Sequence, residues 1–454
     1  MIPALWMWGF TVDDALIPVR YARHLVLGLG WRFDAHGPST DGVTPLPWPL
    51  VLAPLARGDA LVVLGRAKAL GLVVWVGACV ALGREVGGVT KAPAWARASA
   101  LTALALSVPV AAYAVSGMET ALATALATFA ALALRRPLAA AGLAGLAATL
   151  RPEMAPWACV LAAGAAIAGR EKIGRVVAAA GVALAPFVAC AVVRAVVWGR
   201  PAPLALMAKP SDLDQGIAYA GAACVVTLVP LLVLAPLALR RAPAALVVVL
   251  AAAVHVGAVV AVGGDWMPYA RLMVPVVPSL VWAAALASAH AHPAATAARS
   301  LAALALGVYL VVRGGTDGRG VGADRAALVA EARPLLADTT RVAALDIGWV
   351  GAATDADIVD LAGLTDPEIA ALPGGHTSKR VDAMFLLGRH PDALLLYLPG
   401  GLPGGLETWP DATYGHVVEA RLAADEVVAR HFFAAAWLPL GARGAGYVLL
   451  RALP

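Results

Sequence analysis

Residues 69–312 consist almost entirely of alanine, valine, leucine and glycine, and their charges are confined to short clusters. The whole chain is 61% hydrophobic and 14% charged, whereas an average soluble domain carries about 25% charged residues. Residues 313–454 carry charge at an ordinary soluble density. The sequence therefore predicts a polytopic α-helical membrane domain over residues 1–313, followed by a soluble α/β domain over residues 314–454.

Polar connections divide the apolar region into segments, and we expect each segment to form a helix. Several segments are shorter than the roughly 20 residues that cross a bilayer, so tilt or burial against neighbours is expected. Their small side chains favour close helix packing. The ten expected helices cover residues 60–82, 98–115, 118–134, 137–150, 153–169, 176–198, 219–239, 243–262, 272–290 and 299–313.

The connections between these helices alternate in character. One set is basic, and the positive-inside rule predicts that it is cytoplasmic. This set contains Arg84, Lys91, Arg97, Arg135, Arg136, Arg170, Lys172, Arg175, Arg240, Arg241 and the stretch 290–299. The other set, expected on the outer face, comprises residues 116–120, 150–154, 199–216 and 263–271. By parity, the first polar loop and the whole tail are also expected outside.

The first ten residues, MIPALWMWGF, are too few to cross a bilayer that needs about 20. No basic stretch precedes an apolar segment, so we expect no signal peptide. Either these residues lie in the membrane interface, where Trp6 and Trp8 are favourable, or a first helix is truncated or missing. We favour a start placed too far downstream.

Several classes of function lack support in the sequence. The net charge of +5 is modest and its lysines and arginines mark topology, so nucleic-acid binding is not expected. The four cysteines lie in apolar segments and indicate no disulfide framework. Metal-ligand spacings, a phosphate-binding GxxxxGK[ST] loop and a GxSxG nucleophile motif are all absent from the sequence. We expect no resident cofactor, although a divalent cation beside the first-loop carboxylates stays open.

The first polar loop, GFTVDDALIPVRYARHL, carries Asp13 and Asp14 side by side. Adjacent carboxylates repel, so two ionised groups need solvent, a cation or a metal. One could act as a general base on a sugar hydroxyl while its neighbour holds the geometry. The alternative is an N-cap, with Thr11 or Asp13 beginning a helix. Arg20 is then either a solvated helix residue or part of a substrate cavity.

The other outer loops carry further charged residues at helix starts. Glu119 follows SGM, where its charge favours the helix dipole. Arg151 and Glu153 flank Pro152, either as an ion pair or with Arg151 holding an anionic group. In the loop GGDWMPYAR, two glycines precede a polar and aromatic group that contains Asp265, Trp266, Tyr269 and Arg271. The guanidinium of Arg271 would match the oxygens of a lipid phosphate.

The tail contains one dense polar stretch, residues 363–382. LTDPE is typical of a helix start, with Asp366 or its neighbour as cap and a proline after it. The loop GGHTSKR, with His376, Lys379 and Arg380, is either solvated or an anion site above the membrane. Strands are predicted over residues 341–351, 356–364, 393–401 and 446–454, and helices near 322–337 and 423–434.

An ordered set of motifs supports a resemblance that covers almost the whole chain. The motifs are TVDDALIPVRYARHL, SGMETAL, RPEM, GGDWMPYARLMVPVVP, LDIGWVGAATDADIVDLAGLTDPEIA and GHTSKRVD. In this order they resemble the GT-C superfamily of membrane glycosyltransferases. Within it the chain looks most like the mycobacterial terminal arabinofuranosyltransferases of cell-wall arabinan and their bacterial relatives. It departs from that family in lacking a full helix before the acidic pair.

The resemblance implies a polyprenyl-phosphate-dependent glycosyltransferase in a bacterial inner membrane, with the tail outside. Such enzymes pass a sugar, here expected to be arabinofuranosyl, to a glycan or glycolipid acceptor on the outer face. It implies that Asp13 and Asp14 are catalytic. It also implies that the outer loops line the cavity, with Glu119, Arg151, Glu153, Asp265 and Arg271 as its walls. His376, Lys379 and Arg380 would bind phosphate or acceptor from above. A hexosyltransferase of the same superfamily and a flippase of lipid-linked sugars remain as alternatives.

Overall fold

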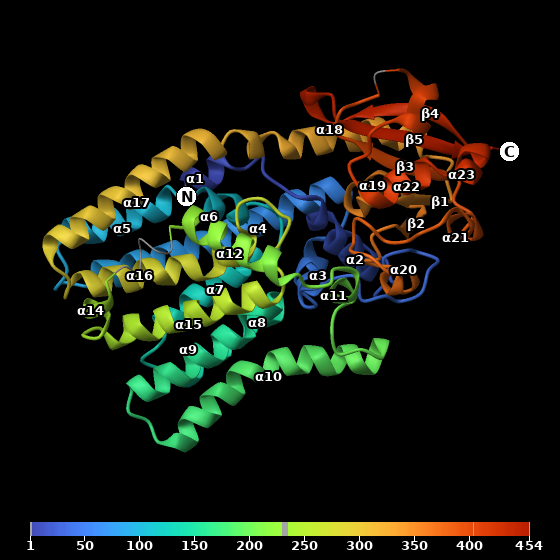
Figure 1. Ribbon diagram of the computed structural model, residues 1–454. Helices are drawn as coiled ribbons and strands as arrows, with labels where there is room; N and C mark the ends of the chain where they lie inside the picture. The colour runs from blue at the N-terminus through green and yellow to red at the C-terminus, as the bar shows by residue number, and fades with distance from the viewer. Residues whose placement is uncertain (1, 229–234, 403, 454) are drawn as a thin grey trace.

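The computed structural model describes residues 2–228, 235–402 and 404–453. A bundle of helices occupies the N-terminal two thirds of the chain, and a small domain with a β-sheet follows it (Figure 1). In Figure 1 the C-terminal domain lies at the end of the bundle where α2, α3 and α11 are found. The turns between α9 and α10 and between α16 and α17 lie at the opposite end.

Helices form where the apolar segments run between polar or proline-containing connections. The helical part contains α1 (Ile2–Trp6), α2 (Leu16–Val26), α3 (Trp48–Leu52), α4 (Ala60–Gly87), α5 (Ala94–Ala105), α6 (Val108–Ala114), α7 (Thr120–Leu132), α8 (Pro137–Leu150), α9 (Ala155–Ala168), α10 (Ile173–Trp198), α11 (Leu204–Ala208), α12 (Leu213–Val226), α14 (Pro236–Leu239), α15 (Pro243–Ala261), α16 (Val277–Ser288) and α17 (Pro293–Gly314). Short 3-10 turns, including η1 (Asp13–Ala15), η3 (Pro152–Met154) and η4 (Arg271–Val276), adjoin several of them.

Five helical segments are long and apolar enough to cross a membrane, and the bent pair α5–α6 makes a sixth if counted as one span. The five are Ala60–Gly87, Ile173–Trp198, Pro243–Ala261, Arg271–Ser288 and Pro293–Gly314. Each of the ten expected segments contains helix, but the segment 98–115 is broken into α5 and α6, which are bent by 57°. Residues 229–234 of the segment 219–239 lie outside the described residues. The chain therefore has the helices of a membrane protein.

Small residues allow the helices to pack closely. A Cβ atom added to Gly145 of α8 would lie 2.6 Å from the carbonyl oxygen of Ala183 in α10, so only glycine permits this approach. The outer face of α10 exposes large apolar side chains, among them Val177, Val192 and Val196. Exposed apolar faces of this extent are expected where a helix meets lipid rather than water.

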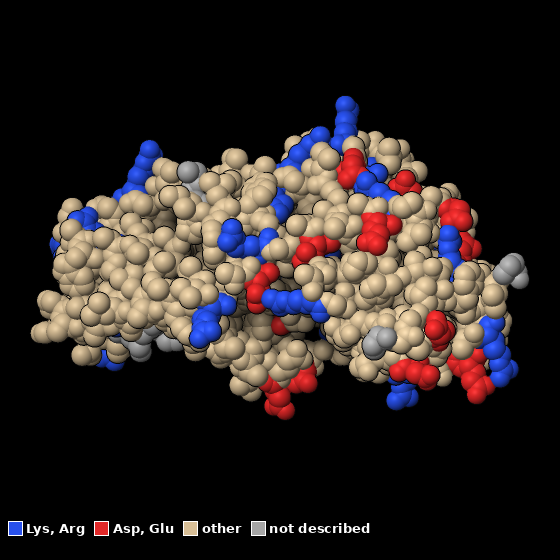
Figure 2. Space-filling model, turned by 90° about the horizontal axis from the view of Figure 1, so that it is seen from above, with Lys and Arg blue, Asp and Glu red and all other residues tan. Residues whose placement is uncertain are grey.

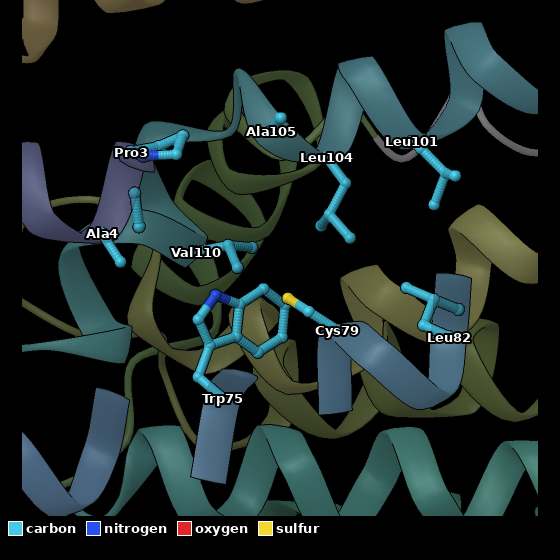
Figure 3. A pocket seen from close by; sticks show the side chains of 10 residues that line it. Pro3, Ala4, Trp75, Cys79, Leu82, Leu101, Leu104, Ala105 and Val110 are labelled. Atoms are coloured by element: carbon cyan, nitrogen blue, oxygen red, sulfur yellow. The ribbon is translucent and has the colours of Figure 1, made fainter. Parts of the chain in front are cut away.

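The N-terminal residues form α1, which packs against α6. Beside it lies an apolar cavity of about 170 Å³, whose walls come from α1, α4, α5 and α6. Figure 3 shows Pro3 and Ala4 on one side of it, with Trp75 and Cys79 of α4 and Leu104 of α5 around the rest. No charged side chain among the described residues lines this cavity, so these residues give it no acid–base chemistry.

The C-terminal domain is built on a five-stranded mixed sheet in the order β2-β1-β3-β5-β4. Its strands are β1 (Arg341–Ala344), β2 (Asp357–Asp360), β3 (Ala393–Leu398), β4 (Phe432–Pro439) and β5 (Gly446–Ala452). β1 pairs in parallel with β2 and β3, whereas β5 pairs antiparallel with β3 and β4. Its helices are α18 (Val321–Leu335), α19 (Ile347–Ala353), α20 (Pro367–Ala371), α21 (Ala383–Gly388), α22 (Val417–Ala423) and α23 (Glu426–His431).

Two predicted elements of this domain are wrong in part. The strand predicted over residues 341–351 ends at Ala344, and α19 begins at Ile347. The helix predicted near 423–434 ends at His431, after which the chain forms β4. Three of the eight residues of β4 are alanine, a residue with little preference for strands. Pairing with β5 therefore decides the conformation there.

Candidate functional site

The side chain of Asp13 is buried and forms hydrogen bonds to the backbone of the C-terminal domain. Its Oδ2 accepts a hydrogen bond from the backbone N–H of Gly348 (2.8 Å), and its Oδ1 accepts one from that of Trp349 (2.9 Å). These N–H groups belong to the first turn of α19, where they have no partner within the helix. Asp13 thus caps a helix of the C-terminal domain. The prediction that Thr11 or Asp13 caps the helix that follows it is wrong, because the N-terminus of α2 receives no side-chain hydrogen bond.

Gly348 makes this approach sterically possible. A Cβ atom at this position would lie 2.1 Å from the backbone oxygen of Asp13 and 2.7 Å from its Oδ2. Any other side chain would push the two segments apart. The first loop and the C-terminal domain are therefore fitted to each other at this point.

Burial raises the pKa of Asp13 to about 7, with Arg325 opposing the rise and Asp346 and Asp14 adding to it. Arg325 donates to the hydroxyl of Tyr447 (3.1 Å), and that hydroxyl donates to Asp346. None of Arg325, Asp346 and Tyr447 was predicted from the sequence to belong to a site. Arg325 and Tyr447 lie outside the quoted motifs, and Asp346 lies in the motif LDIGWVGAATDADIVDLAGLTDPEIA without having been assigned a role, so only the folded domain brings the three to Asp13.

Asp14 has different surroundings from Asp13. Its side chain is 20% exposed, and its Oδ2 lies 4.0 Å from Nζ of Lys209. The same Nζ lies 5.9 Å from the ring centroid of Trp266, in a cation–π geometry. Lys209 follows α11 in the connection 199–216, which the sequence predicts on the outer face without marking this residue as part of a site. Asp14 is thus an accessible carboxylate beside a cation.

Glu119, Arg151 and Glu153 form a buried ion network. NH1 of Arg151 donates to Oε1 of Glu119 (2.9 Å), and its Nε donates to Oε1 of Glu153 (2.8 Å). The predicted Arg151–Glu153 ion pair is confirmed by this contact. Oε2 of Glu119 has no hydrogen-bond partner among the described residues. An unpaired buried carboxylate oxygen is costly, so the network is left unsatisfied at this atom.

Asp265 and Arg271 close the loop between α15 and η4. Nε of Arg271 donates to Oδ2 of Asp265 (2.7 Å), and its NH1 lies 3.8 Å from Sδ of Met118. Burial acts to raise the pKa of Asp265, but Arg271, Lys209 and Arg151 outweigh it and hold the pKa below its ordinary value. Asp265 is therefore a carboxylate at neutral pH, and Arg271 is its nearest counter-charge.

The backbone of this loop is held in uncommon conformations. Tyr269 and Ala270 both have positive φ angles, 60° and 51°. Such conformations cost about 1–3 kcal/mol each for residues with a side chain, and they cluster at functional sites. The hydroxyl of Tyr269 donates to the carbonyl of Gly314 in α17 (2.6 Å). Tyr269 thus fixes the loop to a neighbouring helix.

The folded chain brings these groups from separate loops into one region, which we call the junction cluster. It comprises Asp14, Glu119, Arg151, Glu153, Lys209, Asp265, Trp266, Arg271 and His376. Asp14 acts electrostatically on Arg271, and Lys209 acts on both Asp265 and His376. Burial, followed by the charge of Lys209, lowers the pKa of His376 to about 4, so its imidazole is neutral at neutral pH. Figure 2 shows that the acidic side chains on the viewed face lie between the middle of the molecule and the end that carries the C-terminal domain, whereas the opposite end shows only basic ones.

Besides Asp13 and Tyr269, which were described above, three further predicted site residues do not join the junction cluster. Arg20 is buried and donates to the carbonyls of Phe33, Gly351, Thr354 and Ala356, so it fastens the C-terminal domain to α2. Lys379 is buried, and its Nζ donates to the carbonyls of Ala370 and Leu372. This use of its ammonium contradicts the predicted phosphate contact. Arg380 is exposed, and its backbone N–H donates to the carbonyl of Pro373.

Within residues 2–228, 235–402 and 404–453, no group of three or more His, Cys, Asp or Glu side chains is arranged to hold a metal ion. The cation left open beside Asp13 and Asp14 would have to compete with the two backbone N–H groups that Asp13 already accepts. Any cation in this region would therefore bind chiefly through Asp14 and added water.

Comparison with known protein families gives a match to part of the chain. A family model described as a domain of unknown function, DUF8728, matches residues 323–447. These residues run from α18 into β5, so the match covers the C-terminal domain and none of the apolar helices. Neither the curated proteins nor the solved structures include a match to this chain.

Proposed function

We propose that the chain is a membrane glycosyltransferase of the GT-C type. It would transfer a sugar, in our first choice arabinofuranosyl, from a polyprenyl phosphate to a cell-envelope glycan on the outer face. The observation that supports this best is the junction cluster. It combines an accessible carboxylate, Asp14, with the cations Lys209 and Arg271 at the end of apolar helices. A lipid-phosphate donor and a polar acceptor can meet only at such an end.

The reaction needs a base and a counter-charge for phosphate. The acceptor hydroxyl oxygen forms a bond to the anomeric carbon while the bond from that carbon to the phosphate oxygen breaks. In an inverting transfer, Asp14 takes the hydroxyl proton, and the lipid phosphate leaves with the bonding electrons. Arg271 and Lys209 offset the charge that develops on that phosphate, and partial exclusion of water strengthens both effects.

The roles of the remaining residues follow from their contacts. Arg151 already holds two carboxylates, so we assign it to positioning Glu119 rather than to binding phosphate. The free oxygen of Glu119 would accept a hydrogen bond from a sugar hydroxyl. His376, neutral and contributed by the C-terminal domain, suits contact with the uncharged acceptor. Trp266 is 48% exposed, as expected of a ring on which a sugar stacks.

A flippase of lipid-linked sugars is the alternative from another class. It would use ionisable groups in the middle of the membrane. His255 is an ionisable residue within the apolar helix α15, and its Nε2 is hydrogen-bonded to the carbonyl of Leu272 (2.7 Å). That bond ties α15 to η4 and gives His255 a packing role. A hexosyltransferase of the same superfamily would use the same cluster with a different sugar.

Membranes that contain the chain should be incubated with polyprenyl phosphates carrying labelled arabinofuranose or labelled mannose. We expect label from one donor to enter a polymer, and to do so only when the chain is present. The donor that works identifies the sugar. Label that crosses the bilayer and stays on its lipid would support the flippase and contradict the transferase.

A further inference from the structure

A polar cavity of about 560 Å³ lies at the end of the helices away from the C-terminal domain. Four basic side chains line it, and each comes from a different connection. Lys91 lies between α4 and α5, Arg135 between α7 and α8, Arg241 between α14 and α15, and His290 between α16 and α17. Four segments that are distant in sequence thus contribute one basic residue each to one space.

The charges around this cavity are not balanced by the part of the protein that the structure describes. Glu85 is the one acidic residue among the described residues of its lining. Within the described part of the chain, none of Lys91, Arg135 and Arg241 has a carboxylate within ion-pair distance. Like charges gathered around one cavity repel, and an anion bound between them relieves that repulsion.

The beginning of α15 adds to the positive potential of the same cavity. Ala242, Pro243 and Ala244 line it, and the N-cap residue Ala242 provides no side-chain hydrogen bond. The first backbone N–H groups of a 19-residue helix therefore remain available beside the basic side chains. On its other side the cavity is bounded by Trp282 and Leu286 of α16. The cavity thus has one wall of basic side chains and helix N–H groups, and an opposite wall of apolar side chains.

We propose that this cavity binds a phosphate-bearing anion, with an anionic phospholipid headgroup as its main source. Guanidinium and ammonium groups suit phosphate oxygens, and the wall formed by Trp282 and Leu286 suits the start of a lipid chain. The basic connections are also the ones that the positive-inside rule assigns to the cytoplasmic leaflet, where anionic lipids are common. This site is separate from the junction cluster and does not depend on the proposed transferase activity.

Neighbouring residues provide a matched control. Arg136 follows Arg135 and Arg240 precedes Arg241, and all four side chains are exposed. Only Arg135 and Arg241 line the cavity. A double variant of either pair removes the same charge from the same two connections. If the basic residues act only as topology signals or as a diffuse surface charge, the two double variants will behave alike.

The experiment measures binding of phosphatidylglycerol to the purified full chain in detergent, by native mass spectrometry. Each Lys or Arg near an anionic lipid is worth about 1 kcal/mol. Arg135→Gln/Arg241→Gln is therefore expected to weaken binding about 10- to 30-fold. Arg136→Gln/Arg240→Gln should weaken it less than about 3-fold. Phosphatidylcholine and inorganic phosphate are the parallel ligands, and circular dichroism checks that both variants remain folded.

Each result bears on the proposal. Tight phosphatidylglycerol binding that is lost in the cavity variant alone supports it and identifies a lipid source. Binding of inorganic phosphate with the same dependence on Arg135 and Arg241 supports the phosphate site and identifies a soluble source. Equal losses in the two double variants, no loss in the cavity variant, or equal binding of phosphatidylcholine would overturn it.

Discussion

At the scale of single residues, Asp13 and Asp14 are adjacent in sequence, but their side chains have different partners. Both oxygens of Asp13 accept backbone N–H groups of α19, whereas the side chain of Asp14 lies beside Lys209. A carboxylate already held in two hydrogen bonds is poorly placed to take a proton from an acceptor. We therefore assign positioning of the C-terminal domain to Asp13 and general-base catalysis to Asp14.

The raised pKa of Asp13 predicts a pH dependence of stability. Burial keeps this carboxyl protonated in the folded protein up to about pH 7, whereas an unfolded aspartate loses its proton near pH 4. The folded state thus binds more protons between these values, and its stability falls as the pH rises through them. We expect the midpoint of thermal unfolding to decrease from pH 5 to pH 8, and to decrease less in Asp13→Asn.

Asp34 also makes the stability fall as the pH rises, because burial raises its pKa to about 7 as well. Asp13→Asn is therefore expected to keep part of the pH dependence of the thermal unfolding midpoint. The comparison concerns the slope and not the absolute midpoint, since the amide introduced by Asp13→Asn also alters the cap itself. Identical pH profiles for the wild type and Asp13→Asn would contradict the assignment.

At the scale of secondary structure, α19 is held at both ends by the first loop and α2. Asp13 binds the first N–H groups of α19, and Arg20 donates to the carbonyls of Gly351 and Thr354 at its other end. Both contacts satisfy backbone groups at the helix ends that have no partner within the helix. This double contact sets the position of the C-terminal domain above the junction cluster.

Arg20→Gln tests this attachment, and Arg23→Gln is its control on the same helix. Arg20 is buried, donates hydrogen bonds to several carbonyl oxygens and pairs with the carboxylate of Asp34. Its loss is therefore expected to lower the free energy of unfolding by about 3 kcal/mol or more. Arg23 makes one ion pair, at 3.9 Å, with the 91%-exposed Asp355, so its loss should cost at most about 0.5 kcal/mol. Thermal unfolding and proteolysis of residues 340–360 measure the difference, and equal effects of the two variants would contradict it.

The sequence predicted elements well where a single physical signal decides them. Apolar segments between polar connections marked where helices form, because an apolar helix satisfies its own backbone, but they did not reveal the break between α5 and α6. The prediction failed where tertiary pairing decides, as at β4 and α19. In α19, IGWVGAA carries residues that favour strands, but its first turn receives the carboxylate of Asp13 from another part of the chain. No local pattern contains that contact.

At the scale of the whole molecule, the two ends of the helical bundle differ in chemistry. The junction cluster lies at the end that carries the C-terminal domain, and the basic cavity lies at the other. The sequence indicated this division through its alternating connections. It identified most members of the cluster because charged residues are rare among apolar helices. It missed Lys209 and assigned Lys379 and Arg20 to the site, since charge type alone does not reveal which groups the fold uses internally.

The most direct test of the account compares Asp14→Asn with Asp13→Asn in the labelled transfer assay, at equal amounts of folded protein in the membrane. We expect Asp14→Asn to lower the transfer rate about 10²- to 10⁴-fold, as loss of a general base does, with little change in thermal unfolding. Asp13→Asn should lower the rate less and reduce stability more. Full transfer by Asp14→Asn, or loss of transfer in Asp13→Asn alone, would contradict the account.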